Sequence, residues 1–190
     1  MNRKHWRATA PGAVLALLAL FQPWLEQRMV THMVIELPLL FAIGWWAAPA
    51  GGSGAGWLRM INASGLTGLT VATVISAIWM LPLSLDAAVL DPVAGWLKVG
   101  SVLFAGWITR ISLREARTAV QAFFLLNWAW MTAAAGALYQ QAPERLCSTY
   151  QQGDQTWTGI GLVALVVAVV ATWMAVSFRD GIAFPNASHS

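Results

Sequence analysis

Hydrophobic residues fall into six long runs, which are separated by short polar or glycine-rich stretches. The runs cover approximately residues 8–24, 30–48, 64–83, 93–111, 118–139 and 157–178. Each run is close to the roughly 20 residues that an α-helix needs to cross the core of a bilayer. The runs use most of the chain, so no soluble catalytic domain fits in the remainder. The pattern therefore predicts an all-α, polytopic membrane helix bundle of about six transmembrane helices. Residues 1–190 are expected to form a single integral membrane domain.

Composition supports a membrane protein. The chain of 190 residues is 58% hydrophobic and 10% charged, with a mean hydropathy of +0.61. Soluble domains usually carry about a quarter charged residues. The chain also has 12 tryptophans, a residue that favours the membrane–water interface. The first run follows the basic stretch "NRKHWR" and resembles a signal peptide, but no small-x-small cleavage motif follows it. We therefore expect a retained, short first span, and the alternatives are a cleaved or a re-entrant segment.

The distribution of charge predicts the orientation. With a cytoplasmic N-terminus, most basic residues lie on or near the inner side: Arg3, Lys4, Arg7, Arg59, Arg110, Arg114, Arg117 and Arg179. Most acidic residues, Glu26 among them, then lie outside. This is the positive-inside pattern of multi-pass proteins, and it explains the net charge of +3. No basic cluster with interleaved aromatic residues indicates nucleic-acid binding. The single cysteine, Cys147, falls in the last outer loop and has no partner in the chain.

Two ionisable residues, Glu36 and Lys98, lie within predicted spans. A charge near the centre of a span costs roughly 2.5–3.5 kcal/mol on insertion scales. Glu36 lies about 10 Å from the outer end of its run at 1.5 Å per residue, and Lys98 lies a comparable distance into its own run, so an ion pair is predicted. The pair would either lock two helices together or line a polar pocket that opens outward. Four further polar residues collect on the same side as candidate pocket-lining or structural groups: Asp86, Asp154, Gln155 and Cys147. Asp154 has the simpler interpretation of a helix N-cap.

The stretch "MVTHMVIELPLL" combines apolar residues with candidate metal ligands. Met29, His32, Met33 and Glu36 are spaced by three and four residues, so they share one face of a helix. Imidazole and thioether are suitable copper ligands, and thioether particularly suits Cu(I). Met80, in "IWMLPLSLDAA", is expected at the same membrane face. Methionine in an apolar helix is usually a packing residue, and that interpretation stays open for all three methionines.

Four stretches in order resemble the CtaG family, the membrane assembly factors of haem–copper cytochrome c oxidase. They are "MVTHMVIELPLL", "WMLPLSLDAAV", "WLKVGSVLFAGW" and "DQTWTGIGLV", and they extend from residue 29 to about residue 175. The resemblance implies a protein of the bacterial inner membrane that helps to insert copper into the oxidase. Oxidase subunits or a periplasmic copper chaperone would be its partners. The chain departs from the family at two positions, because Met80 and Lys98 stand where members often have histidine.

Two functions from different classes follow from these features. In the first, the protein is an assembly factor that holds or passes Cu(I) at the periplasmic face through His32, Met29, Met33 and Met80. In the second, it is an accessory subunit without metal that docks a respiratory complex. A transporter would need polar residues through the full depth of the bundle. An enzyme is not expected, because the sequence shows no nucleophile–base pair and no H-E-x-x-H motif.

The predicted topology can be tested through Cys147. We expect a membrane-impermeant maleimide to label this thiol in intact spheroplasts, because its loop lacks the arginine excess of the inner loops. Labelling is measured by the mass shift on a denaturing gel, with lysed spheroplasts as the control for total reactivity. Labelling that occurs only after lysis would invert the topology.

Overall fold

The computed structural model describes residues 12, 14–16, 18, 20–22, 24–49, 60–142 and 150–179. The helices whose bounds the structure describes are a π-helix and six α-helices: η1 (Thr31–Glu36), α2 (Leu37–Ala47), α4 (Leu66–Trp79), α5 (Pro82–Leu90), α6 (Pro92–Glu115), α7 (Thr118–Gln141) and α8 (Gln152–Arg179). Residues 14–16 and 20–22 are also helical. No strand occurs in the described part of the chain. The all-α class predicted from the hydrophobic runs is confirmed.

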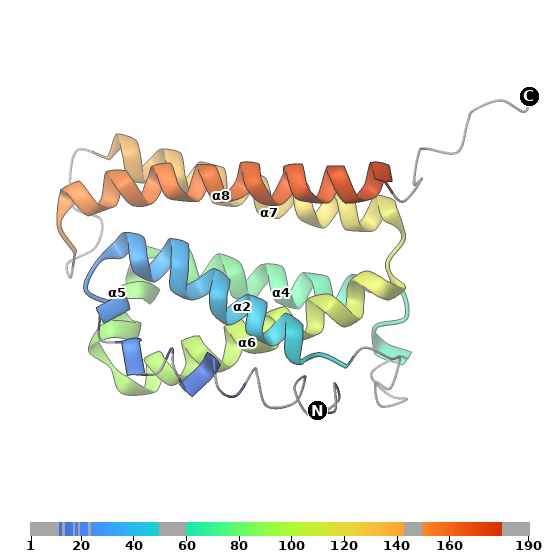
Figure 1. Ribbon diagram of the computed structural model, residues 1–190, viewed down its shortest axis with the longest axis horizontal. Helices are drawn as coiled ribbons and strands as arrows, with labels where there is room; N and C mark the ends of the chain where they lie inside the picture. The colour runs from blue at the N-terminus through green and yellow to red at the C-terminus, as the bar shows by residue number, and fades with distance from the viewer. Residues whose placement is uncertain are drawn as a thin grey trace, which may run out of the picture.

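The helices are arranged as two groups that lie side by side (Figure 1). In one group, α6 packs against both α2 and α4, and the short helix α5 packs against α6 at one end. In the other group, α7 and α8 run along each other for most of their length. The two groups meet where α7 contacts α4 and where α8 contacts η1. The segment η1 therefore lies at a junction between the groups.

Glycines allow α2 and α6 to pack with their backbones in contact. A Cβ atom on Gly106 of α6 would collide with the carbonyl oxygen of Phe41, and one on Gly44 of α2 would collide with that of Leu103. Small residues permit this close approach, which membrane helices use widely. Gly106 therefore lies at a point of backbone contact between the two helices. Gly100 does not, because it is exposed and a Cβ atom there would meet no described atom within 4 Å.

Proline explains the π-helix that precedes α2. A proline within a helix has no N–H to donate, and its ring clashes with the carbonyl four residues earlier. Pro38 is the second residue of α2, so the clash would fall on Val34. The chain widens just before this point, and the Leu37 N–H donates to the His32 carbonyl, five residues earlier. Single π-turns of this kind often occur at functional sites.

Prolines also define the starts of α5 and α6. Pro82 and Pro92 each occupy the first turn of their helix, where a missing N–H costs nothing. The Asp91 side chain accepts a 3.0 Å hydrogen bond from the Val93 N–H and so caps α6. The chain turns by 76° between α4 and α5. The span predicted over residues 64–83 therefore contains α4 and ends at the bend, where Pro82 begins α5.

Two of the described helices are long and apolar enough to cross a membrane, at 118–141 and 153–179. The bent pair α4–α5 is a third candidate if it is taken as one span, and residues 31–47 form a shorter apolar helix. The coarse prediction of an apolar, membrane-type helix bundle agrees with these helices. The first predicted span lies partly outside the described residues, but Leu15 and Leu18 pack against a core cluster around Leu40 and Trp79.

Large apolar side chains are exposed along the two long helices. On α7 they include Phe123 and Trp130, which are 65% and 76% exposed, and on α8 they include Trp157 and Phe178. Apolar surface of this extent marks a face that contacts a membrane or another protein. The outward faces of α7 and α8 therefore suit a lipid environment.

We predict that Gly106→Ala destabilises the protein, because the new methyl group would force α2 and α6 apart. Overpacking of this kind typically costs about 1–3 kcal/mol. Gly100→Ala, on the same helix, is the matched control and should leave the melting temperature unchanged or raise it, since alanine is the better helix former. Thermal melts in detergent measure both. Equal effects of the two variants would show that backbone contact between α2 and α6 does not limit stability.

A buried charge cluster around Lys98

Lys98 of α6 is completely buried, and three acceptors surround its ammonium group. Lys98 Nζ lies 2.6 Å from Glu36 Oε1 and 2.7 Å from Glu26 Oε1. It also lies 3.2 Å from His32 Nε2. An ammonium group has three N–H donors, so all three find a partner. The ion pair that the sequence predicts between Glu36 and Lys98 is confirmed, and it is one part of a larger cluster.

The contacts of His32 define its protonation. Lysine can only donate, so His32 Nε2 accepts from Lys98 and carries no hydrogen. The other ring nitrogen, Nδ1, lies 2.7 Å from the hydroxyl of Tyr150. A neutral imidazole with its hydrogen on Nδ1 satisfies both contacts, with Nδ1–H donating to the tyrosine oxygen. His32 is therefore a neutral acceptor that is fixed from both sides.

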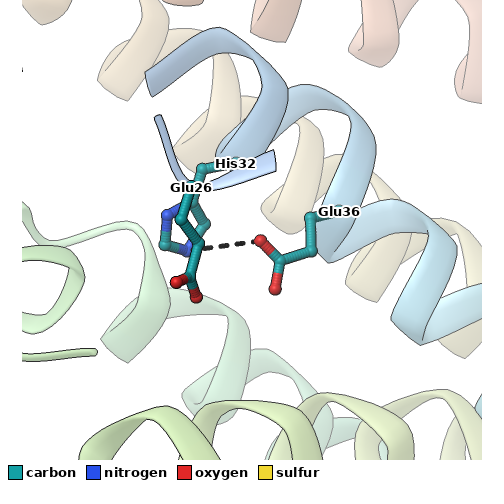
Figure 2. A group of neighbouring side chains, drawn as sticks. All are labelled: Glu26, His32 and Glu36. Atoms are coloured by element: carbon teal, nitrogen blue, oxygen red, sulfur yellow. Dashed lines mark ion pairs between the residues drawn. The ribbon is translucent and has the colours of Figure 1, made fainter. Parts of the chain in front are cut away.

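Three residues of the cluster have atoms that can bind a metal ion. The candidate ligand atoms of Glu26, His32 and Glu36 all lie within 4.8 Å of one another. Figure 2 shows the imidazole and the two carboxylates directed toward a common region, with His32 Nε2 4.0 Å from Glu36 Oε2. Lys98 Nζ contacts all three side chains. The ammonium group of the protein thus lies where these ligands would hold a cation.

Local structure brings the three acceptors together from a short segment. The chain turns at residues 26–28, and the Thr31 hydroxyl donates to the carbonyls of Leu25 and Arg28, which closes this turn. Glu26 Oε1 also accepts a 3.0 Å hydrogen bond from Gln22 Nε2. His32 and Glu36 both belong to η1. The turn and the π-helix therefore face α6 with two carboxylates and one imidazole.

The three predicted methionine ligands lie in apolar surroundings. Met29 and Met33 are buried in a core cluster that also contains Leu85, Tyr139, Tyr150 and Leu162. The sulfur of Met80 lies 3.7 Å from the Thr132 hydroxyl of α7. His32, by contrast, makes its polar contacts with Tyr150, Lys98 and Glu36. The shared face of Met29, His32, Met33 and Glu36 is buried. Tyr150 belongs to the cluster of the two methionines and also contacts His32, whereas Lys98 contacts only His32 and Glu36 of this face.

The other predicted polar residues have separate positions. Asp86 is half-buried in α5. Asp154 lies in the first turn of α8, inside the helix, where a carboxylate favours the positive end of the helix dipole. Gln155 is buried and donates a 3.3 Å hydrogen bond to the Tyr139 carbonyl, which joins α8 to α7. Cys147 lies outside the described residues.

Sequence reasoning misses Glu26 and Tyr150 as members of the cluster. The charge pattern places Glu26 only on the outer side, and helical spacing does not relate it to His32, because the chain turns between them. Tyr150 lies 118 positions from His32 in the sequence, so no local pattern joins them. Two features of the sequence could have indicated Glu26. It lies near the outer end of the run that contains Glu36, and a buried Lys98 needs more hydrogen-bond acceptors than one carboxylate provides.

The cluster contains more acidic groups than basic groups. Two carboxylates face one ammonium group, and Glu36 Oε2 is buried with no hydrogen-bond partner among the described residues. Glu26 is the most accessible member, with 15% of its side chain exposed, whereas Lys98 and His32 are fully enclosed. The cluster therefore holds one positive charge, the ammonium group of Lys98, between α6 and η1.

We predict that Lys98→Met is the most damaging single change in the cluster. It leaves two carboxylates without their cation, and breaking a buried ion pair from one side typically costs about 3–5 kcal/mol. Adding Glu36→Gln should recover part of this loss, because Glu26 keeps Gln22 and some solvent. Thermal melts of the single and double variants in detergent measure the coupling.

The matched control combines Lys98→Met with Glu115→Gln. Glu115 is exposed at the far end of α6, so its removal should not recover stability. Strictly additive effects of Glu36→Gln and Lys98→Met would contradict a coupled cluster.

Comparison with protein-family models, curated proteins and solved structures finds no match for this chain. The resemblance to the CtaG family therefore depends on the four sequence motifs alone. The geometry around Lys98 is the independent observation, and it concerns the same region as the first and third of those motifs.

Proposed function

We propose that this chain is a membrane accessory protein that docks a respiratory complex of the cytochrome c oxidase type, and that it carries no resident copper. One observation carries the second half of this proposal. The ammonium group of Lys98 lies among Glu26, His32 and Glu36, which are the residues best placed to hold a cation in the described part of the chain. The protein supplies its own positive charge at that position.

A metal ion could bind there only if Lys98 moved. The ammonium group would lose three partners at distances between 2.6 and 3.2 Å. An uncompensated ammonium in apolar surroundings is strongly disfavoured. The imidazole of His32 is also committed on both sides, to Lys98 and to Tyr150. These contacts favour a structural role for the cluster.

The departures from the CtaG pattern support the same conclusion. Members often have histidine at the position of Lys98, and a neutral histidine there would be a metal ligand. Lysine at this position replaces a ligand by a cation. The docking role itself is proposed from the four motifs and the expected topology of about six spans with a cytoplasmic N-terminus in the bacterial inner membrane. The exposed apolar faces of α7 and α8 would lie against lipid or the partner complex.

One observation favours copper handling as a second candidate. Glu36 Oε2 is buried without a hydrogen-bond partner in the described part of the chain, next to an imidazole and a second carboxylate. Displacement of Lys98 would expose two carboxylates and an imidazole, a donor set that suits Cu(II) or Zn(II) better than Cu(I). In this second candidate function, the protein would bind a metal ion transiently, when Lys98 moves away from the cluster.

We predict that the detergent-purified protein retains well below one copper per chain after incubation with Cu(I) or Cu(II) and removal of free metal. Lys98→His should gain a bound Cu(II) or Zn(II), because it removes the ammonium group and adds an imidazole. Metal analysis measures the content, and a rise in melting temperature with added Zn(II) in the variant alone would confirm binding to the folded state. His32→Ala in the Lys98→His background should lose the metal again. Stoichiometric copper in the unaltered protein, lost with His32→Ala, would refute the metal-free proposal.

The docking role has its own test in cells. Removal of the gene should lower the amount of assembled oxidase in membranes, measured from its haem spectrum and its copper content. Met33→Leu and Met80→Leu keep the side-chain volume but remove the sulfur, so both should restore the oxidase fully if thioethers hold no copper. Unchanged oxidase in the deletion strain would refute the docking role.

A further inference from the structure

A cavity of about 460 Å³ lies between the two groups of helices. Five helices line it, α2, α4, α6, α7 and α8, together with Met33 of η1. Its volume falls within the range of roughly 300–1,000 Å³ that is typical of ligand sites. Its lining residues come from both helix groups, so it lies between the α2–α4–α6 group and the α7–α8 pair. The cavity is separate from the charge cluster, since Lys98, Glu26 and Glu36 do not line it.

The cavity is long and narrow. Its lining residues run from Leu69 to Met80 on α4, from Val102 to Leu113 on α6, from Gln121 to Thr132 on α7 and from Leu162 to Trp173 on α8. Each of these stretches covers eleven steps of a helix, or about 16 Å at 1.5 Å per residue. All four helices therefore line the cavity over the same length, and we call this elongated cavity the slot. A chain-like ligand fits such a slot better than a compact one.

The walls of the slot suit hydrocarbon. Phe41, Phe124, Trp79 and Trp128 are among the apolar side chains that line it. Its threonines already use their hydroxyl groups: Thr73, Thr109 and Thr132 each donate to the backbone carbonyl four residues earlier, at 2.7 to 2.9 Å. Gln121 donates its amide hydrogens to the carbonyls of Leu113 and Ala116. A polar ligand would find few donors here.

Two arginines lie near one end of the slot, although neither lines it. Trp45 and Leu113 line this end, and Arg110 donates through Nη1 to the carbonyls of Trp45 and Trp46. Arg114 donates through Nη1 to the carbonyl of Pro49. A guanidinium has five N–H donors, so these bonds leave further donors on each arginine. Arginine binds phosphate with several hydrogen bonds at once.

We propose that the slot holds an acyl chain of an anionic membrane phospholipid and that Arg110 and Arg114 bind its phosphate. A lipid supplies both parts that the site requires, an apolar chain of sufficient length and a negative charge at one end. Basic pockets between membrane helices bind anionic headgroups in this way. The chain would fill the space between the two helix groups and join them where their own contacts are few. This inference does not depend on the proposed docking role.

The test uses the full-length protein in mild detergent, with phosphatidylglycerol and phosphatidylcholine as probes and native mass spectrometry to count bound lipid. We expect one phosphatidylglycerol to be retained in preference to phosphatidylcholine. Ser76→Phe should lose most of this lipid, because Ser76 lines the slot and the ring would project into it from α4. Val74→Phe is the matched control, since Val74 is 52% exposed on the same helix, and it should keep the lipid. Leu165→Trp fills the slot from α8 and provides a second variant if Ser76→Phe does not fold.

The headgroup has a separate test. Arg110→Gln and Arg114→Gln should each reduce the preference for phosphatidylglycerol by about fivefold, as expected for ~1 kcal/mol per arginine near an anionic lipid. Arg28→Gln, an exposed charge in the turn before η1, is the control and should have no effect. Equal lipid retention by Ser76→Phe and Val74→Phe would place the lipid on the outer surface and overturn the proposal. Equal retention of the two lipids by the unaltered protein would overturn the assignment to anionic lipid.

Discussion

The burial of one ammonium group constrains the arrangement around it. Lys98 is fully enclosed, so its charge must be compensated by protein groups, and three acceptors surround it at hydrogen-bond distance. Two belong to η1 and the third to the turn that precedes it. The hydrogen bonds and ion pairs of Lys98 therefore hold η1 and the preceding turn, which lead into α2, against α6. It also explains why a helix in apolar surroundings contains both a histidine and a glutamate.

The π-helix that carries His32 and Glu36 lies directly before Pro38. An uninterrupted α-helix through this proline would place its ring against the Val34 carbonyl. The wider turn avoids that clash and includes both His32 and Glu36. Tyr150, from the segment before α8, then holds the second ring nitrogen of His32. Through this contact, the cluster in the first helix group is joined to the second group.

Close backbone contact at glycines holds each helix group together, at Gly136 and Gly159 between α7 and α8 as well as between α2 and α6. Backbone contact at Gly44 and Gly106 brings α2 and α6 together, and a 2.8 Å hydrogen bond from Trp79 to Ser101 joins α4 to α6. Between the groups lies the apolar slot, bounded at one end by the region of Met33 and Met80 and at the other by Trp45 and Gln121. Rigid contacts within groups and a slot between them suit a protein whose two halves are joined by a bound lipid.

The sequence by itself determined the all-α class, the apolar character of the helices and the pairing of Glu36 with Lys98. These features depend on the length of hydrophobic runs and on the cost of burying a charge, both of which can be read locally. Only the tertiary structure decided that Glu26, His32 and Tyr150 complete the cluster, because the turn at residues 26–28 and the return of the chain before α8 bring them together. The same holds for Met29, Met33 and Met80. Their residue types suggested copper ligands, but which neighbours a sulfur meets is set by helix packing, and here these neighbours are largely apolar.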